Sequence, residues 1–478
     1  MVEPTRPHGS GIPMSAPGIP RPAPVDMAHH SHLTGLFAPQ RDEVDVHDLD
    51  VIGEIPPDLH GAYLRNGPNP RFDPIGRYVY PLDGDGMVHR VEIADGRARY
   101  TNRFVRTPMV EAEERAGHAI WGGVTDLYTP GVDEVGPDLA GTSRDLPDIN
   151  IVRHGGRLLA MAESAPPYRL DPADLSTLGR ETCGDAMAVG STAHPKRDPA
   201  TGELVLFNYM LEAPYLTWAV LAADGTTSRP PTPVDGVNTP LMIHDMALTE
   251  RYVVLVLCPL VFDIAAMLTG GALLDWRPDD GTRIALIPRD GGPVRWASCD
   301  AFWVWHFAGA RDLPDGRVQV DYAQWAYPHG FARPDAPCPG GLVRAVVDPE
   351  RGTVDRQTVF DRDVEFPRVD DRTLTHAGGP VATVGKLGRD SAGWDSLRFF
   401  DPDAGTEAHW DAGSLAVGEP QYIPGATADY WGMIGTDRID LTSWFVILPA
   451  ADPASGPLAR VELPIRVPSG LHGAWLPV

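Results

Sequence analysis

The sequence predicts an all-β fold, and three observations support this prediction. Glycine and proline are abundant, at 50 and 49 of the 478 residues, which suits short strands and turns rather than a helical bundle. From about residue 50 onward, runs of aliphatic, aromatic and β-branched residues alternate with turns rich in Gly, Pro and Asp. Long stretches with a helical period are almost absent. A chain of this length fits two domains or one large closed β architecture.

The predicted strands follow one another at intervals typical of hairpins. The clearest runs lie at 157–164, 203–210, 241–248, 252–258, 283–289, 302–307, 317–325 and 443–449. Turns such as DPATG at 198–202 and DGG at 290–292 join some of them. Sets of strands recur at roughly forty to sixty residues, the interval of propeller blades, without a clean sequence repeat. A propeller would bring residues that are far apart in sequence together at its axis.

Charge and cysteine content narrow the functional classes. A formal net charge of −25 argues against nucleic-acid binding, because phosphate contacts need clustered cationic surface. The cysteines show no CxxC spacing and indicate no disulfide framework, so we expect a cytoplasmic protein. Residues 1–32 are rich in Pro, Gly and His and lack the apolar core of a signal peptide, so we expect a disordered tail there.

One apolar segment departs from the strand pattern. Residues 259–276, PLVFDIAAMLTGGALLDW, are compatible with a helix but are interrupted by Asp263 and by Gly270–Gly271. This makes a poor transmembrane span. A surface helix, a lid or a weak membrane-surface contact fits better, so the protein could be peripheral to a membrane. An ordinary packed helix is the alternative.

A motif rich in Asp and Gly, DGDGMVH at 83–89, could be taken for a calcium or phosphate loop. It lacks the alternating acidic ligands and the terminal Glu of an EF-hand. We therefore expect a tight turn between strands.

Four of the 16 histidines lie in strand-like or turn-flanked apolar settings and are candidate metal ligands: His194, His244, His306 and His472. Imidazoles supply neutral nitrogen ligands to transition metals. Three glutamates lie in equally apolar, proline-marked surroundings: Glu163, Glu365 and Glu419. Buried carboxylates are costly without a partner, and they can hold the far ring nitrogens of metal-bound histidines. Spacing alone is weak evidence, since any one histidine is more often a satisfied core or surface imidazole. No HExxH motif is present.

The chain resembles the carotenoid cleavage oxygenase family over nearly its whole length from about residue 50. The resembling stretches are GAYLRNGPNPRF (61–72), DGDGMVH (83–89), NRFVRT (102–107), AHPKRDPATGE (193–203), IHDMALTERYVV (243–254), EFPRVDDR (365–372), GEPQYIP (418–424) and GLHGAW (470–475). Their order and spacing are those of the family.

The resemblance implies a seven-bladed β-propeller over residues 33–478, with Fe(2+) on its axis under a cap of loops and short helices that form an apolar tunnel. The iron ligands and catalytic centre would be His194, His244, His306 and His472. Glu163, Glu365 and Glu419 would accept hydrogen bonds from three of these imidazoles. The expected reaction is cleavage of a conjugated C=C bond of an apolar substrate by O2, without a side-chain acid, base or nucleophile. A tetrahedral structural zinc site is the metal alternative.

Three positions depart from patterns of the family and bear on the substrate. Ala162 stands where apocarotenoid-cleaving members commonly have Trp and lignostilbene-cleaving members have Lys. Phe104 replaces a tyrosine that assists phenol binding, and Ile149 replaces a threonine near the open iron position. An apolar, wider pocket favours a carotenoid or apocarotenoid. The alternatives are a lignostilbene or phenylpropanoid cleaver, and a catalytically silent propeller that binds carotenoid or lipid.

Overall fold

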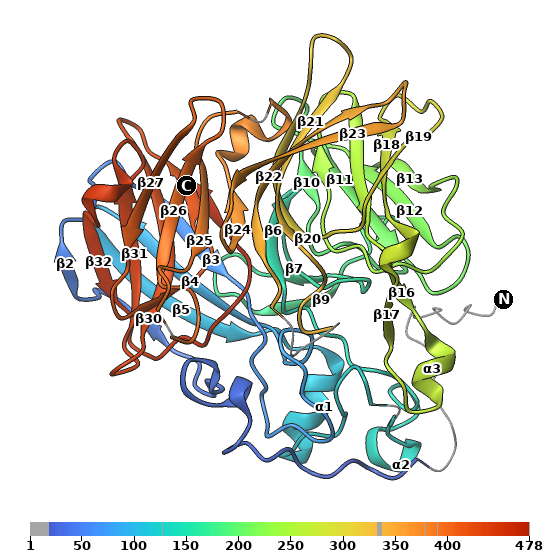
Figure 1. Cartoon of the computed structure of the whole chain (residues 1–478). Coiled ribbons are helices and arrows are strands. Elements are labelled where there is room, and N and C mark those ends of the chain that lie inside the picture. Colours follow the sequence, from blue (N-terminus) through green and yellow to red (C-terminus); the bar gives the residue numbers. More distant parts are fainter. Residues whose placement is uncertain (1–18, 127, 332–336, 377, 390, 478) are drawn as a thin grey trace.

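The strands of the protein form a seven-bladed β-propeller, which confirms the predicted fold class (Figure 1). The computed structural model describes residues 19–126, 128–331, 337–376, 378–389 and 391–477. In these residues seven antiparallel sheets of four to six strands make up the blades.

The blades follow the chain in order, and their strands pair as meanders. The first blade holds β1 (Asp45–Val46), β5 (Arg97–Phe104), β4 (Met87–Ala94), β3 (Gly61–Arg65) and β33 (Gly473–Pro477). The second and third hold β6 (Asn150–His154), β7 (Arg157–Met161), β8 (Tyr168–Leu170) and β9 (Thr177–Arg180), then β10 (Lys196–Arg197), β11 (Leu204–Tyr209), β12 (Leu216–Leu221) and β13 (Thr227–Pro233). The fourth holds β14 (Ala247–Leu248), β15 (Tyr252–Leu257), β18 (Thr282–Pro288) and β19 (Arg295–Cys299).

The remaining blades lead back to the chain start. The fifth holds β20 (Trp303–Asp312), β21 (Val318–Trp325), β22 (Gly340–Asp348) and β23 (Thr353–Phe360). The sixth holds β24 (Val364–Arg368), β25 (Val381–Gly385), β26 (Ser396–Asp401) and β27 (Thr406–Asp411). The seventh holds β28 (Leu415–Val417), β29 (Gln421–Pro424), β30 (Asp429–Asp437), β31 (Ser443–Pro449), β32 (Ala459–Glu462) and β2 (Val51–Gly53).

Two pairings between distant parts of the chain close the ring. Strand β33 pairs with β3, and β2 pairs with β32, so the first and seventh blades each combine early and late segments. Strands of neighbouring blades contact one another, as in β33 with β6, β14 with β20, β20 with β24 and β29 with β33. These strands therefore surround the axis.

The hydrophobic core lies between neighbouring blades. Strand β15, YVVLVL, shows why its sequence is continuously apolar. Val254 and Val256 pack in a cluster shared with the fifth blade, whereas Val253 and Leu255 pack in a cluster shared with the third. Because successive side chains of a strand point to opposite faces, a blade enclosed on both sides needs apolar residues at every position.

The helices gather at one end of the molecule, the lower end in Figure 1, and we call them with the β16–β17 hairpin the cap. They are α1 (Pro108–Ala116), α2 (Val132–Val135) and α3 (Ile264–Leu268). Helix α1 begins where the Thr107 hydroxyl accepts the Val110 N–H at 3.2 Å, with Pro108 at its first position, and ends at Gly117 with φ of 76°. Short 3₁₀ helices are η1 (Ser31–Leu33), η2 (Gly35–Phe37), η3 (Pro278–Asp280), η4 (Asp371–His376) and η5 (Pro453–Ser455).

The apolar segment 259–276 is mostly a hairpin, so the expectation of a helix there was wrong for most of its length. Strands β16 (Leu260–Phe262) and β17 (Leu274–Trp276) pair antiparallel and leave only five residues for α3. Asp263 caps this helix by accepting the Ala266 N–H at 2.8 Å. Gly270, with φ of 86°, follows the helix and lets the chain reverse. Across the described part of the chain, none of the helices has the length and apolarity that crossing a membrane would take.

The predicted disordered tail divides into two parts. Residues 1–18 lie outside the described residues. Within residues 19–32, the backbone at 23–25 hydrogen-bonds to the segment between β3 and β4. The Val25 N–H donates to the Pro74 carbonyl at 2.8 Å, and the Gly76 N–H donates to the Ala23 carbonyl at 2.7 Å. Composition alone did not indicate these partners, since they lie about fifty residues further along the chain.

The DGDGMVH motif leads into β4 and holds neighbouring loops against the first blade. Asp83 accepts the N–H groups of Val79 at 2.8 Å and Val124 at 2.7 Å. Asp85 accepts the Arg71 N–H at 2.8 Å and forms an ion pair with Arg144. Residues 83–86 of the motif thus end the long loop between β3 and β4 instead of forming a tight turn between strands, and the two carboxylates accept hydrogen bonds from buried donors.

Asp83 gives a pH-dependent prediction. Burial raises the pKa of its carboxyl group to about 6, although the two backbone N–H donors act in the opposite direction. The folded-state pKa lies above the usual 3.8, so the contribution of this group to stability is lost as pH rises through about 6. Asp83→Asn should therefore gain stability relative to the unchanged protein between about pH 4 and pH 7, by about 3 kcal/mol at most. Urea unfolding at both pH values measures this gain; a difference in stability that is the same at both would contradict it.

Candidate metal centre

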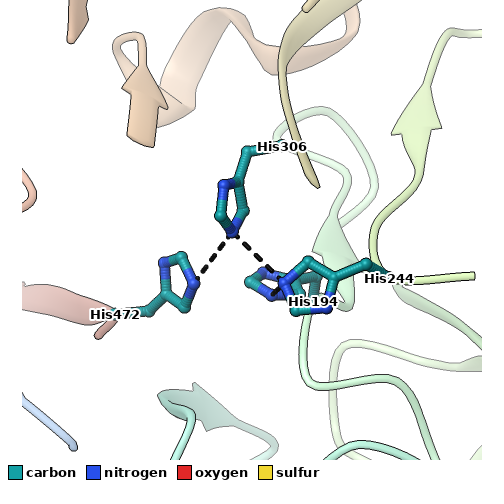
Figure 2. A group of neighbouring side chains, drawn as sticks. All are labelled: His194, His244, His306 and His472. Carbon is teal, nitrogen blue, oxygen red and sulfur yellow. Dashed lines mark hydrogen bonds between the residues drawn. The ribbon is translucent and has the colours of Figure 1, made fainter. Parts of the chain in front are cut away.

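Four histidine side chains converge at the axis of the propeller, and we call them the histidine cluster (Figure 2). Its members are His194, His244, His306 and His472. The Nε2 atoms of His194 and His244 lie 3.1 Å apart. The Nε2 atom of His306 lies 3.3 Å from that of His244 and 3.1 Å from that of His472. One ligand atom from each residue lies within 4.8 Å of all the others, so one ion could contact all four.

The cluster forms because axis-lining strands of different blades start at the same level. His306 lies near the start of β20, and His472 directly precedes β33. His194 lies two residues before β10, and His244 lies three before β14. The predicted strand at 241–248 is thus regular only at Ala247–Leu248, because the residues around His244 turn toward the axis instead of pairing.

Each of the three predicted glutamates accepts a hydrogen bond from a different histidine of the cluster. Glu163 Oε2 lies 2.6 Å from His244 Nδ1. Glu365 Oε2 lies 2.5 Å from His306 Nδ1, and Glu419 Oε1 lies 2.9 Å from His472 Nδ1. Within the described residues, His194 has no carboxylate inside salt-bridge distance. The structure therefore brings all seven predicted metal-site residues together, with a glutamate bound to three of the four histidines as expected.

The hydrogen bonds fix the direction of the lone pairs. An imidazole that donates its Nδ1–H to a carboxylate carries a lone pair on Nε2. The Nε2 atoms of at least three histidines then face one another without a proton between them, which is unfavourable unless a cation lies at the centre. Two nitrogens about 2.1 Å from one metal at a right angle would lie roughly 3 Å apart, close to the observed spacing. The donor set thus fits a single transition-metal ion.

Electrostatics favour the neutral, metal-binding form of two of the four imidazoles, His194 and His472. Burial, and then the three neighbouring imidazoles, hold the pKa of His194 well below its usual value of 6.5. Burial lowers the pKa of His472 to about 4, although the Glu419 carboxylate partly offsets it. Burial raises the pKa of Glu419, but Arg368 and His472 lower it by more, to about 2. The two imidazoles are therefore neutral and the carboxylate is ionised at pH 7, which is the state that metal binding needs.

Each glutamate is held in turn by a donor that the sequence analysis did not find. The Tyr209 hydroxyl donates to Glu163 Oε1 at 2.5 Å, and the Trp325 indole N–H donates to Glu365 Oε1 at 2.8 Å. Glu419 accepts the side-chain amide of Gln421 and the Gly473 N–H, and Arg368 lies 3.7 Å away. These donors lie on strands far from their partners in sequence, so only the folded blades bring them together. Gln421 is the exception, two residues after Glu419.

Aromatic rings line the cluster. The ring of Trp305 lies 5.0 Å from that of His244, in an edge-on arrangement. The ring of Phe366 lies 5.1 Å from His306 and 5.2 Å from His472. Phe366 has φ of 50°, an unusual backbone conformation for a bulky residue and a sign of a constrained position. The sequence analysis missed both aromatics, although each directly neighbours a predicted site residue.

The three predicted pocket residues are all buried but differ in their relation to the cluster. Ile149 contacts it through the backbone, since its carbonyl accepts the His472 N–H at 3.1 Å. Ala162 immediately precedes Glu163 and is 3% exposed. Phe104 ends β5, where its N–H donates to Glu43 at 2.7 Å and its ring lies 5.2 Å from the Arg71 guanidinium carbon. Their role toward a substrate stays a prediction.

The chain is similar to proteins of one family along almost its full length. The model of the family described as retinal pigment epithelial membrane protein matches residues 37–477. Isoeugenol monooxygenase of Pseudomonas nitroreducens is 28% identical, with 93% of this chain and 98% of that protein covered. Carotenoid 9,10(9',10')-cleavage dioxygenase 1 of Arabidopsis thaliana is 29% identical, with 93% of this chain and 89% of that protein covered.

A solved structure shows the same architecture. The lignostilbene dioxygenase of Pseudomonas brassicacearum matches with a TM-score of 0.85 at 30% sequence identity. The match covers 96% of this chain and 100% of the other. The similarity thus includes every blade and the axis.

Proposed function

Because this chain belongs to the retinal pigment epithelial membrane protein family, the family of the carotenoid cleavage oxygenases, we propose that it cleaves a conjugated C=C bond with O2 at a ferrous iron centre. The observation that carries this proposal is the histidine cluster. It presents only neutral nitrogen donors, and three of its rings are fixed by buried carboxylates. We further propose that the substrate is a carotenoid or apocarotenoid.

The histidines and the glutamates of the site have different roles in the reaction. His194, His244, His306 and His472 would hold the iron through their Nε2 atoms. When bound, ferrous iron supplies the redox chemistry that lets O2 react with an alkene. The carboxylates of Glu163, Glu365 and Glu419 orient the rings and offset the charge of the metal. The overall reaction breaks one C=C bond and one O–O bond and forms two C=O bonds. The net reaction therefore neither consumes nor releases a proton.

The substrate proposal rests on what the pocket positions lack. Ala162 carries no ammonium group and Phe104 carries no hydroxyl, so neither side chain can hydrogen-bond to a phenol hydroxyl. The rings of Trp305 and Phe366 beside the cluster offer flat apolar surface suited to a polyene. The similarity to isoeugenol monooxygenase and to a lignostilbene dioxygenase keeps a phenylpropanoid substrate as the second candidate.

A direct comparison of substrates tests the proposal. Iron-loaded protein is incubated in air with an apocarotenal and, separately, with a hydroxystilbene, and carbonyl products are identified by mass spectrometry. We expect two carbonyl fragments from the apocarotenal. Cleavage of only the stilbene would contradict the proposed carotenoid or apocarotenoid substrate and would favour the phenylpropanoid class. Cleavage of neither, in protein that has bound iron, would favour a binding propeller without catalysis.

Installing phenol-binding groups should shift the preference between substrates. We expect Phe104→Tyr combined with Ala162→Lys to raise turnover of a hydroxystilbene relative to an apocarotenal by about tenfold or more, since a hydrogen bond to a charged group is worth about 1.5–3 kcal/mol. Phe104→Tyr with Ala162→Met is the matched control, because Met approaches Lys in size but has no charge. If the ratio of hydroxystilbene turnover to apocarotenal turnover were equal in the two double variants, these positions would not contribute to substrate selection.

A further inference from the structure

A buried aspartate, Asp245, connects three of the segments that carry the histidine cluster. It follows His244 directly and is 3% exposed. Its Oδ2 atom accepts the N–H of Phe307, the residue after His306, at 3.0 Å. Its Oδ1 atom lies 2.7 Å from the ammonium group of Lys196, two residues after His194. Both carboxylate oxygens are thus used toward other blades.

The connection crosses three neighbouring blades at their axial ends. Lys196 begins β10 in the third blade, Asp245 precedes β14 in the fourth, and Phe307 lies on β20 in the fifth. The N–H of Met246 also donates to Asp245 Oδ1 at 2.7 Å, which fixes the carboxylate relative to its own backbone. Few regular ladder bonds hold this region, because β10 and β14 have only two residues each.

We infer that Asp245 and Lys196 form a positioning pair that holds His194, His244 and His306 at the mutual spacing that binds the metal. The inference rests on the proposed function and adds to it a role for two residues that do not contact the metal or the substrate. The two-residue strands β10 and β14 give the segments that carry His194 and His244 few ladder bonds, and the ion pair adds a constraint between their two blades.

Stability alone is a weak explanation for this pair. The desolvation cost of a buried ion pair is comparable to its Coulombic attraction, so such pairs add little net stability. A better-supported role of buried ion pairs is to favour one packing arrangement of the chain over alternative arrangements. The position of this pair, one or two residues from three separate candidate ligands, matches that role.

The test measures metal binding by the metal alone. Co2+ is titrated into metal-free protein, and both the affinity and the visible d–d spectrum are recorded for the unchanged protein, Asp245→Asn, Lys196→Met and the double variant. We expect Asp245→Asn to lower Co2+ affinity about 10–100-fold and to alter the spectrum, as residues that orient metal ligands commonly do. The double variant should lose no more than Asp245→Asn alone, because the two residues act as one unit.

The ion pair between Asp321 and Arg344 is a matched control. It links β21 and β22 of one blade at 2.8 Å, and its side chains are 3% and 15% exposed, against 1% and 16% for Asp245 and Lys196. Asp321→Asn should leave Co2+ affinity and spectrum unchanged even where it lowers the melting temperature. Unchanged affinity and spectrum in folded Asp245→Asn would overturn the inference while leaving the metal site intact. Failure of the unchanged protein to bind Co2+ would overturn the site and the inference together.

Discussion

Replacing His472 by alanine should remove iron from the protein and abolish cleavage of the alkene. His472 is 3% exposed, and its Nε2 atom lies 3.1 Å from that of His306. The change removes one of four neutral donors and leaves the Glu419 carboxylate buried without its imidazole partner. We expect the loss of affinity to exceed the roughly 10–100-fold that follows changes of a residue that only orients a ligand. Iron per chain, measured by mass spectrometry after desalting, gives the result.

A buried histidine outside the cluster controls for loss of packing. His154 is 5% exposed, and its Nε2 atom lies 2.7 Å from the Ala222 carbonyl. His154→Ala should lower stability but keep one iron per chain. Equal iron content in His472→Ala and the unchanged protein would show that the metal, if bound, lies elsewhere.

Glu419→Gln should have the second largest effect, a loss of iron affinity of about 10–100-fold with the fold intact. The amide can present only one acceptor oxygen, whereas the carboxylate accepts from the His472 Nδ1–H, the Gly473 N–H and the Gln421 amide. The exchange also removes one of the two carboxylates near Arg368, whose guanidinium keeps only its ion pair with Asp371 at 3.3 Å. Competition between the protein and a coloured Fe2+ chelator measures the affinity.

Glu113→Gln is the control for that experiment. Glu113 is fully buried and bound to Arg144 in the cap, away from the axis. This change should affect stability alone. A fall in iron affinity as large as that of Glu419→Gln would indicate that both variants act through general loosening of the protein.

The fold was predictable because its signals are local. Strand β31 lies at Ser443–Pro449, the full extent of the predicted run, since turns bound it on both sides. The α3 region was not predictable in the same way. Leu260–Phe262 pairs with Leu274–Trp276 across a short helix, and an apolar run of this length gives no periodic signal to separate helix from hairpin.

The metal centre was predictable only in part, because some of its contacts arise only when the blades pack together. Histidines and glutamates in apolar context were only candidates when taken one by one, and the resemblance to a family singled out the seven residues. The sequence gives no comparable signal for three other residues of the site, because tyrosine, tryptophan and lysine are common at the ends of strands. These residues are Tyr209, Trp325 and Lys196. Their relevance arises from contacts between blades, such as that of Tyr209 with Glu163 across β11 and the loop after β7.

The central claim is that the four Nε2 atoms of the histidine cluster hold a single iron ion. Anomalous diffraction from crystals of iron-loaded protein, measured on both sides of the iron absorption edge, tests it most directly. The arrangement of the cluster predicts one peak per chain at the axis, at about ligand distance from all four Nε2 atoms. A peak outside the cluster, or protein that cleaves its substrate with no iron peak at the axis, would contradict the claim.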